Sequence, residues 1–231
     1  MKKQALFNWS GGKDSAFALG EILKNKEFDI SYLLTSIGIN TRRVSMHGLR
    51  EELVKQQAKE IGLPLVLLEL PESPDMETYE NSIFELMKKA KNQGIDYSIF
   101  GDIFLEDLKK YRESQLAKVD FKAVFPLWKR NTNDLIREFI DKGYKSIITA
   151  VDDSKLSKEF AGQIIDEYFI KQLPKNVDAC GENGEFHSFV FDAPYFKKPI
   201  PFSKGEIVHK TYEVKDKNIS HGFWFCDLLA Q

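Results

Sequence analysis

Residues 4–17, Gln-Ala-Leu-Phe-Asn-Trp-Ser-Gly-Gly-Lys-Asp-Ser-Ala-Phe, decide the fold of this chain. The apolar run 5–7 is typical of a buried strand, and the residues from 16 onward have the apolar spacing of a helix. A glycine turn lies between the two. We therefore predict a strand, a turn and a helix N-terminus in immediate succession, an arrangement in which unpaired backbone N–H groups bind an anion.

The residue types in this turn suit phosphate. Two adjacent glycines are able to adopt positive φ and let the backbone approach an anion without a Cβ in the way. A lysine supplies positive charge, and serines supply hydroxyl donors. The spacing is not that of a Walker P-loop, and the chain has no G-x-G-x-x-G. The predicted phosphate-binding residues are Ser10, Gly11, Gly12, Lys13, Asp14 and Ser15. The alternative is a capped glycine turn that binds nothing.

The composition excludes several classes of protein. The 231 residues are 42% hydrophobic, enough for a sizeable core, and a net charge of −2 gives no general attraction to nucleic acid or anionic membranes. No apolar run approaches the roughly 20 residues of a membrane span. Cys180 and Cys226 form neither a disulfide framework nor a C-x-x-C motif. We expect a cytoplasmic protein without a membrane or nucleic-acid partner.

Apolar periodicity predicts a doubly wound α/β fold with a mostly parallel sheet, because strands alternate with helices. Pro126 is expected to interrupt one of the strands. A nucleotide-binding domain is placed at 1–122, and a smaller C-terminal α+β domain at 123–231. The expected strands after the first are 29–39, 65–70, 97–100, 124–128, 146–151, 207–214 and 222–226, and the expected helices are 13–26, 49–61, 81–90, 105–119, 132–143 and 156–169.

Ligands bind beyond the carboxyl ends of parallel strands, and the first such end after the turn belongs to the strand 29–39. There the backbone of Ser36 and Ile37 is expected to contact adenine. His47 and Arg50 lie at the start of the next helix. We consider them candidates for nucleotide or substrate binding, with a solvated loop histidine as the alternative.

Gly101 and Asp102 close the strand 97–100 and are expected at the same edge of the sheet as the glycine turn. A carboxylate at this position is able to hold Mg²⁺, which prefers oxygen ligands. It is equally able to cap the helix that follows. Both interpretations of Asp102 stay open at this point.

A second unusual cluster lies at 178–188, Asp-Ala-Cys-Gly-Glu-Asn-Gly-Glu-Phe-His-Ser. A surface loop needs no such set of glutamates, cysteine and histidine, and loops carry function more often than cores do. We predict that this loop takes part in catalysis or substrate binding. Solvated glutamates are the alternative.

The glycine turn, Ser-Gly-Gly-Lys-Asp-Ser, resembles the PP-loop of the N-type ATP pyrophosphatases, which split ATP between its α- and β-phosphates. With the segments 101–103, 125–128 and 180–196, it makes nearly the whole chain similar to the diphthine–ammonia ligase family. Asn183 and Phe186 depart from the family's common residues. The resemblance implies an adenine nucleotide alpha hydrolase-like fold, ATP and Mg²⁺ as cofactors, and ammonium as a substrate. Family members amidate the carboxylate of diphthine on elongation factor two, which is the expected partner if the host makes diphthamide; a homodimer stays open.

The resemblance also implies a mechanism. A carboxylate attacks the α-phosphorus of ATP, and ammonia then displaces AMP from the acyl-adenylate. Lys13 neutralises phosphate charge, and Mg²⁺ is held through Asp14 or Asp102. The residues implied to orient ammonium and accept its proton are Glu182 and Glu185, with His187 as the alternative base. This mechanism requires the loop 182–187 to lie on the same side of the sheet as the glycine turn, and the Gly11 and Gly12 amides to be open to solvent.

Two rival functions remain. A PP-loop enzyme that thiolates tRNA needs a sulfur-carrying cysteine, for which Cys180 is the candidate, but the balanced charge argues against RNA. A nucleotide-binding sensor would bind ATP or AMP without turnover. The formation of AMP separates the sensor from both enzymes.

Overall fold

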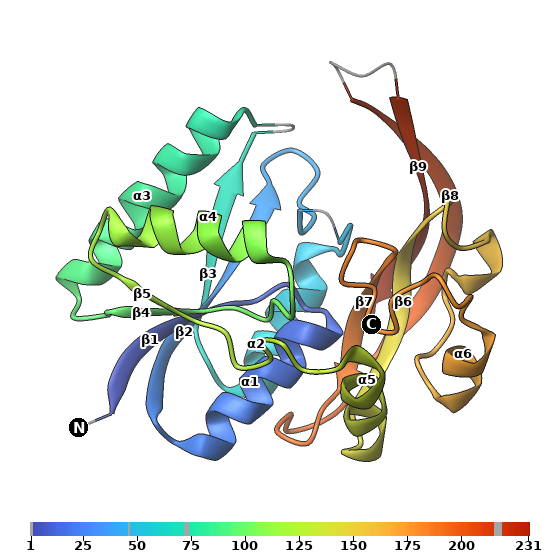
Figure 1. Ribbon diagram of the computed structural model, residues 1–231, viewed down its shortest axis with the longest axis horizontal. Coiled ribbons are helices and arrows are strands. Elements are labelled where there is room, and N and C mark those ends of the chain that lie inside the picture. The colour runs from blue at the N-terminus through green and yellow to red at the C-terminus, as the bar shows by residue number, and fades with distance from the viewer. Residues whose placement is uncertain (1, 46, 72–73, 215–218) are drawn as a thin grey trace.

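The computed structural model describes residues 2–45, 47–71, 74–214 and 219–231, and Figure 1 shows their arrangement. The first half forms a five-stranded sheet from β1 (Lys3–Asn8), β2 (Phe28–Gly38), β3 (Leu65–Leu70), β4 (Tyr97–Ile99) and β5 (Lys122–Val124). All neighbouring strands are parallel, in the order β3-β2-β1-β4-β5. The doubly wound α/β fold predicted from the sequence is confirmed.

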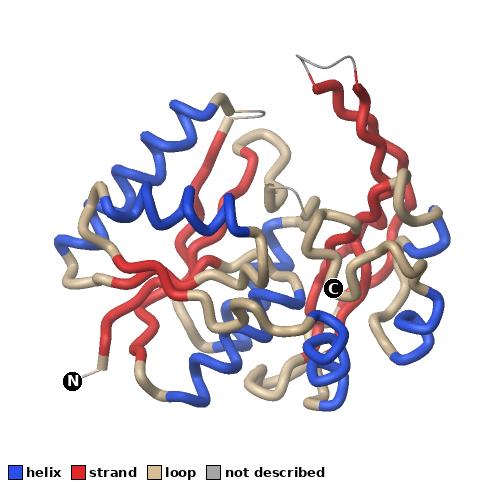
Figure 2. The backbone as a smooth tube through the Cα atoms, viewed as in Figure 1, coloured by secondary structure: helices blue, strands red, loops and turns tan. Residues whose placement is uncertain are grey.

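Helices cover both faces of this sheet (Figures 1 and 2). They are α1 (Lys13–Asn25), α2 (Glu51–Ile61), α3 (Met76–Asn92) and α4 (Glu106–Ala117). Successive residues of a strand face opposite sides, so Phe7 joins the core with α1 and α2, whereas Leu6 joins a second core with α3 and α4. In the described ranges, no helix is both long and apolar enough to cross a membrane.

The strand order reverses at β1, since β2 and β3 lie on one side of it and β4 and β5 on the other. The carboxyl ends of β1 and β4 therefore diverge into different connections. Such a reversal is where open α/β sheets bind their ligands. The glycine turn after β1 and the Gly101–Asp102 pair after β4 both lie at this point.

The second half is a smaller antiparallel sheet with short helices, which confirms the predicted C-terminal α+β part. Its order is β7-β6-β9-β8, and the hairpin of the last two strands extends beyond the rest of the molecule (Figure 1). The elements are α5 (Thr132–Asp141), β6 (Lys145–Asp152), the 3-10 helix η1 (Lys158–Phe160), α6 (Glu167–Gln172), β7 (Phe186–Asp192), β8 (Phe202–Val214) and β9 (Ile219–Ala230).

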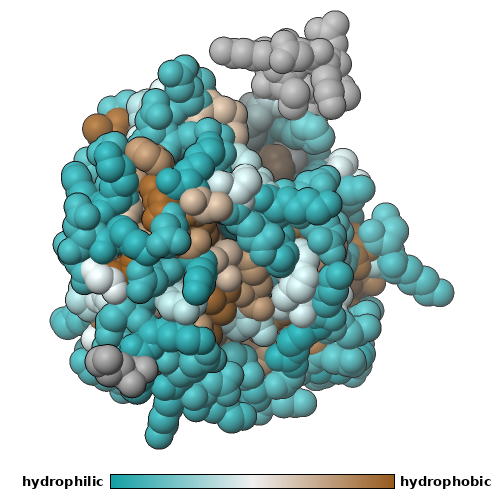
Figure 3. All heavy atoms as spheres, turned by 60° about the vertical axis from the view of Figure 1, so that its left-hand side comes forward, coloured by the Kyte–Doolittle hydropathy of each residue, from teal (hydrophilic) through white to brown (hydrophobic). Residues whose placement is uncertain are grey.

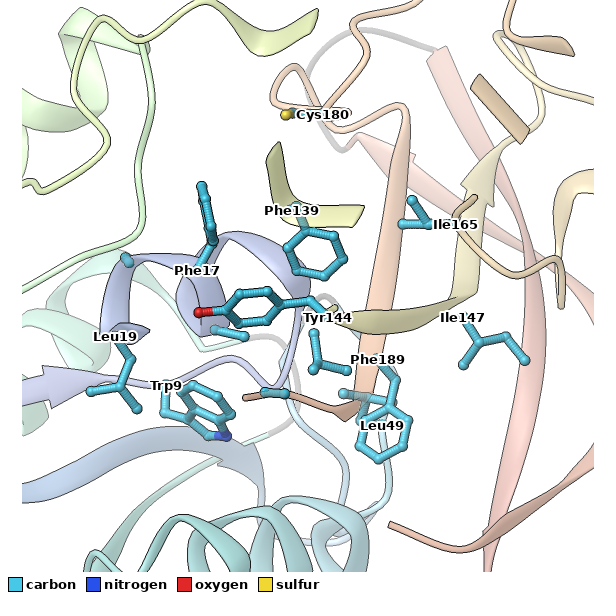
Figure 4. Packing of buried hydrophobic residues seen from close by; sticks show 14 of the residues in the cluster. Trp9, Phe17, Leu19, Leu49, Phe139, Tyr144, Ile147, Ile165, Cys180 and Phe189 are labelled. Carbon is cyan, nitrogen blue, oxygen red and sulfur yellow. The ribbon is translucent and has the colours of Figure 1, made fainter. Parts of the chain in front are cut away.

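One hydrophobic core joins the two halves (Figure 4). Phe17 of α1 packs edge-on against Phe139 of α5, with ring centroids 6.0 Å apart, and against Tyr144, at 5.4 Å. Trp9 and Phe189, from opposite ends of the chain, belong to the same core. Because this core holds β7 beside α1, the residues before β7 are brought to the glycine turn.

The prediction of one amphipathic helix at 156–169 is wrong. Residues 163–165 instead run along β6: the N–H of Ile148 donates to the Gln163 carbonyl at 2.8 Å, and the N–H of Ile165 donates to the Ser146 carbonyl at 2.9 Å. On that side of β6, β9 pairs only with residues 150–152. The segment therefore completes the hydrogen bonding of β6, and Gly162, with a φ of 83°, turns the chain into place.

The strand predicted at 124–128 is also too long. β5 ends at Val124, and the Trp128 N–H donates to the Phe125 carbonyl at 3.2 Å in a turn. Pro126 has no N–H to offer to a strand partner, which accounts for the early end. The helix predicted at 81–90 is longer than expected, because Asp75 caps its start by accepting from the Thr78 N–H at 2.8 Å.

Candidate active site

The glycine turn has the predicted strand–turn–helix form: β1 ends at Asn8 and α1 begins at Lys13. Gly11 uses the freedom of glycine and adopts a positive φ of 81°. The φ of Gly12 is −90°, which other residues also adopt. Gly12 is instead required for close approach, since a Cβ there would lie 3.1 Å from both the His47 ring and the Ser188 carbonyl oxygen.

The second motif, residues 178–188, lies directly on this turn, as the mechanism implied by the resemblance requires. The backbone N–H of Lys13 donates to the Ser188 hydroxyl at 3.2 Å, and the N–H of Val190 donates to the Gly11 carbonyl at 2.9 Å. The loop 182–187 therefore sits on the same edge of the sheet as the glycine turn. This contact gives the two motifs a common site.

The expectation that the glycine amides are open to solvent is wrong. Gly11 and Gly12 are buried, and the N–H of Gly12 donates to the Ser10 hydroxyl at 3.2 Å. The Ser15 hydroxyl, 3.1 Å from that of Ser10, donates to the Gly12 carbonyl at 3.0 Å. Serine hydroxyls thus accept hydrogen bonds from amides that were expected to face a phosphate, and a phosphate must exchange with them to reach these amides.

Lys13 carries a buried positive charge in the site. Its side chain is 4% exposed, and Nζ lies 2.8 Å and 2.7 Å from the two carboxylate oxygens of Asp14. Burial works against the ammonium group, but the Asp14 carboxylate outweighs it and raises the pKa of Lys13. Lys13 therefore stays protonated, 5.3 Å from the centre of the Phe186 ring.

Two histidines stack beside the turn. The rings of His47 and His187 lie 4.5 Å apart between centroids. Burial, together with the charge of Lys13, lowers the pKa of His187 to about 4, and burial also holds the pKa of His47 well below its usual range. Both rings are neutral at pH 7. His47 Nδ1 is buried, has no hydrogen-bond partner among the described residues, and lies 3.4 Å from a Cβ placed on Gly12.

Glu182 connects the second motif to the end of β4. One of its carboxylate oxygens accepts from the Ile103 N–H at 2.7 Å and, more weakly, from the Phe104 N–H at 3.4 Å. Burial, with the nearby Asp14 carboxylate, raises the pKa of Glu182 to about 7. A carboxyl group with this pKa exchanges a proton near neutral pH, as a general base must.

Glu185 does not fit the catalytic role predicted for it. It is 3% exposed, and its carboxylate accepts from the Asp178 N–H at 3.1 Å and from both the backbone and side-chain nitrogens of Asn183 at 3.0 Å. These bonds occupy both carboxylate oxygens inside the loop. Glu185 therefore organises the loop that presents Glu182.

Gly101 and Asp102 lie where predicted, against the start of α1. A Cβ on Gly101 would lie 2.9 Å from the Asp14 carbonyl carbon and the Ser15 nitrogen. Asp102 does not cap a helix in the described contacts. Its carboxylate instead forms an ion pair with Arg112 at 2.8 Å. Asp14 and Asp102 offer the hard oxygen ligands that suit Mg²⁺. The described residues contain no cluster of three metal-binding side chains, so phosphate oxygens would complete such a site.

Ser36 and Ile37 lie at the carboxyl end of β2, but the following loop folds back over them. The Ser36 carbonyl accepts from the Ser45 N–H at 3.1 Å, and Ile37 is fully buried and bridges to Val44. This loop carries His47 to the glycine turn. The adenine contact through Ser36 and Ile37 stays a prediction.

The sequence interpretation missed Gln57 of α2. This fully buried side chain accepts from the Trp9 indole N–H at 2.9 Å and donates to the carbonyls of Gly11 and Val190 at 3.0 Å and 2.6 Å. It thus fastens the glycine turn to β7. A glutamine among the apolar positions of an amphipathic helix was the available signal, since buried polar groups require partners.

Asp227 of β9 holds the loop after β2, a role that no sequence pattern indicates. Its carboxylate binds Arg50 at 2.7 Å and Arg43 at 2.9 Å, and Arg43 also donates to the Gly48 carbonyl at 2.6 Å. Burial opposes the charge, but hydrogen bonds from Arg50 and Arg43 lower the pKa of Asp227 to about 2. Asp227, Arg43 and Arg50 thus form a clamp that fastens this loop. Arg50 belongs to the clamp, while His47 is the residue that reaches the turn.

Comparisons with known proteins show the family of the chain. Models of the diphthamide synthase N-terminal and C-terminal domains match residues 1–123 and 131–218. The chain belongs to the diphthamide synthase family. The resemblance that the two motifs carry is thereby confirmed.

The curated relatives are named diphthine–ammonia ligases. The chain is 31% identical to the Homo sapiens protein over 132 residues, which are 54% of this chain and 49% of that protein. It is 26% identical to the Danio rerio protein over 229 residues, 86% of each chain. The chain spans about half the length of the mammalian relatives it matches.

Among solved structures, a U34-tRNA thiolase from Methanococcus maripaludis matches with a TM-score of 0.36 and 14% identity, over 60% of this chain and 56% of that one. A likeness at this level carries no argument about function.

Proposed function

We propose that this chain is an ATP-dependent ligase that joins a carboxylate to ammonia and releases AMP and pyrophosphate. The name diphthine–ammonia ligase, which its relatives carry, supports the ligation to ammonia. The observation that carries the proposal is the hydrogen bond from the Lys13 N–H to Ser188. It places the loop of Glu182 and His187 against the turn that suits phosphate. Activation and amide formation therefore have one site available.

The first step forms a bond between a carboxylate oxygen and the α-phosphorus of ATP and breaks the bond to the leaving pyrophosphate. Positioning and charge stabilisation dominate such transfers. Lys13 is protonated and, at the N-terminus of α1, adds its charge to the helix dipole. His47 Nδ1 is an unused polar atom at the same turn and suits a phosphate oxygen.

The second step forms a bond between ammonia nitrogen and the acyl carbon and breaks the bond to AMP. Ammonia attacks only when neutral, so a base must take the proton of ammonium. Glu182, with a pKa of about 7, suits this task. His187, with a pKa of about 4, is neutral but a much weaker base. We therefore assign the proton to Glu182.

Mg²⁺ would be held by Asp14 and Asp102 with the phosphates, and when bound it would neutralise charge on the departing pyrophosphate. Both carboxylates are ion-paired in this structure, with Lys13 and Arg112. The elongation factor two of a host that makes diphthamide is the proposed acceptor. These assignments rest on the family and on the chemistry of the residues.

The thiolation alternative is disfavoured by the state of Cys180. The thiol is fully buried, its Sγ donates to the Thr132 carbonyl at 3.4 Å, and burial raises its pKa far above the ordinary range. A nucleophilic or sulfur-carrying cysteine needs access and a thiolate. Cys180 has neither, and the small thiol fills the core beside the loop.

The test is an assay for AMP and pyrophosphate with ATP, Mg²⁺ and ammonium, with and without unamidated elongation factor two. We expect equal amounts of both products, dependent on acceptor and ammonium, and unchanged turnover in Cys180→Ser. Tight ATP binding without AMP in any combination would identify a sensor. Loss of turnover in a folded Cys180→Ser protein would favour the thiolation chemistry.

A further inference from the structure

The hairpin of β8 and β9 presents an aromatic surface to solvent. The strand register places Val208 and Lys210 of β8 opposite Phe225 and Phe223 of β9, and Tyr212 lies two residues further along the same face. We call these five residues the aromatic face. Tyr212 is 51% exposed and Val208 is 36% exposed. The Tyr212 ring lies 6.1 Å from that of Phe223 and 6.5 Å from that of Phe225, between centroids.

The aromatic face does not serve the hydrophobic core. Trp224, on the opposite face of β9, packs against the main core, whereas Phe223 and Phe225 belong to neither core of the described residues. On the side of the parallel sheet, Figure 3 shows hydrophobic side chains in hollows between hydrophilic ones. Tyr212 instead lies toward the end of the hairpin that extends beyond the rest of the molecule (Figure 1). Exposed aromatic side chains on such an element are typical of a protein interface.

The aromatic face continues the side of the sheet on which the candidate active site lies. His187 of β7 and Phe225 of β9 both pair with Ala150 of β6, one on each side, so their side chains share a row across the sheet. The loop after β2 covers this row: His47 stacks on His187, and a Cβ on Gly48 would lie 3.1 Å from the Phe225 ring. A protein that brings a carboxylate to the glycine turn therefore has the aromatic face directly beside its path.

The charges of this side of the sheet favour an acidic partner. The Lys210 ammonium lies 5.7 Å from the centre of the Phe225 ring. Two carboxylates on the same side already have partners, because Asp227 is held by the clamp and Asp152 accepts the N–H of residue 154 at 2.8 Å. A single lysine is little for nucleic acid, whose binding depends on several phosphate contacts. The residues of the face therefore suit a protein surface that combines apolar and acidic side chains.

We propose that the aromatic face is the docking surface for the protein that carries the acceptor carboxylate, and that it receives an apolar segment flanked by acidic side chains. The inference rests on the proposed function, since it takes the acceptor to be a protein. Tyr212 and Phe223 pack against the apolar segment, and Lys210 pairs with an acidic group beside it. Docking holds the acceptor next to the glycine turn, so that its carboxylate reacts as part of one complex.

Calorimetric titration with unamidated elongation factor two, the proposed acceptor, tests the aromatic face without ATP. We expect a dissociation constant of about 1 μM that rises as salt is added. Tyr212→Ser removes an aromatic contact and should weaken binding about tenfold. Lys210→Glu opposes the acidic group and should weaken it by about the same factor. No binding to the wild-type protein, or unchanged affinity in both variants, would overturn the proposal.

The matched control is Tyr168→Ser. Tyr168 of α6 is 70% exposed and lies outside the aromatic face, so its replacement should leave the affinity unchanged. Thermal unfolding checks that all three variants are folded. In the turnover assay, Tyr212→Ser should raise the KM for the acceptor about tenfold and leave kcat and the affinity for ATP unchanged. A fall in kcat with an unchanged KM would contradict a docking role.

Two further titrations test other occupants of the aromatic face. One uses a single-stranded RNA oligonucleotide, and the other is a concentration series of the protein alone. RNA binding or self-association that Tyr212→Ser abolishes, with binding to elongation factor two unaffected, would overturn the proposal in favour of that occupant.

The outcome is distinguishable from that of the proposed function. If binding of elongation factor two depends on Tyr212 and Lys210 but no AMP is ever formed, the docking surface stands and the ligase reaction falls. If AMP forms with the acceptor but both variants leave its KM and its dissociation constant unchanged, the reaction stands and the docking proposal falls.

Discussion

The hydroxyl of Ser188 accepts a hydrogen bond from the backbone N–H of Lys13 at 3.2 Å, although 175 positions separate the two residues. The amide belongs to the first turn of α1, where an anion would be expected to accept its hydrogen bond. Ser188 therefore does for the ligand-free turn what a phosphate oxygen would do in a complex. Ligand binding and this contact compete for the same N–H group.

Replacement of Ser188 by alanine tests that competition. Ser188→Ala is expected to lower the free energy of unfolding by about 1 kcal/mol, because the Lys13 amide loses its partner. ATP should bind up to roughly fivefold more tightly, since it no longer displaces a hydroxyl. Calorimetry and denaturant unfolding measure the two effects, with Ser203→Ala on β8 as the control. Weaker ATP binding in a stable Ser188→Ala protein would show that the hydroxyl itself contacts the nucleotide.

Lys13 is expected to stabilise charge in the transition state of the first step. Lys13→Ala should raise the barrier to AMP formation by roughly 2–4 kcal/mol, a loss of about 30- to 1,000-fold in rate. Lys24→Ala, at an exposed position of the same helix, should be close to wild type. Pyrophosphate release measures both. A folded Lys13→Ala protein that releases pyrophosphate at the wild-type rate is incompatible with the mechanism.

The local part of the site was predictable from the sequence. A short apolar run, two glycines and a helical spacing specify the turn after β1, and the positive φ of Gly11 follows from residue type. The strands expected to end at 39 and 100 from their apolar runs end one residue earlier, at 38 and 99. Such features depend on residues that are neighbours along the chain.

The distant part was not predictable, for reasons that particular residues show. Residues 156–169 have helical spacing, yet the unpaired side of β6 between 146 and 148 recruits 163–165 as a partner. Tertiary hydrogen bonding overrides local propensity in such cases. The burial of the Gly12 amide under Ser10, and the engagement of Glu185 by its own loop, depend in the same way on contacts that the sequence does not display.

Glu182 gives the enzyme a predicted dependence on pH. With a pKa of about 7, it is a carboxylate, and hence a base, only above neutral pH. The rate of amide formation at a fixed concentration of ammonium ion should therefore rise through pH 7 and level off. Glu182→Gln should react more slowly, and its rate should not rise through pH 7. A rise through pH 7 that persists in Glu182→Gln would assign the titration to another group.

The stability of the protein offers a second readout of Glu182 that needs no substrate. Its folded-state pKa of about 7 exceeds the ordinary value of 4.5. Between these two values the folded state binds more protons than the unfolded state, so the free energy of unfolding falls as pH rises. Glu182→Gln stays neutral and should make that decline shallower.

Asp227 is expected to position His47 through the loop that Arg43 and Arg50 fasten. Asp227→Asn removes the charge of the clamp and leaves its shape, so the loop should hold His47 less firmly against Gly12. We expect the KM for ATP to rise about tenfold with little change in kcat, and Asp227→Glu to restore part of the loss. An unchanged KM in both variants would show that the clamp supports only the fold.

Acid unfolding separates the charge of this clamp from its shape. Hydrogen bonds from Arg50 and Arg43 outweigh burial and lower the pKa of Asp227 from 3.8 to about 2. The ion pairs therefore contribute stability that is fully present above pH 3.8 and is lost as pH falls through 2, a change of roughly 2 kcal/mol. Asp227→Asn lacks this contribution, so its stability should be lower at pH 7 and should converge with that of wild type near pH 2. If the two proteins differ equally at both pH values, the charge of Asp227 is not the source of the difference, and the rise in KM must then be explained by altered hydrogen bonds at position 227.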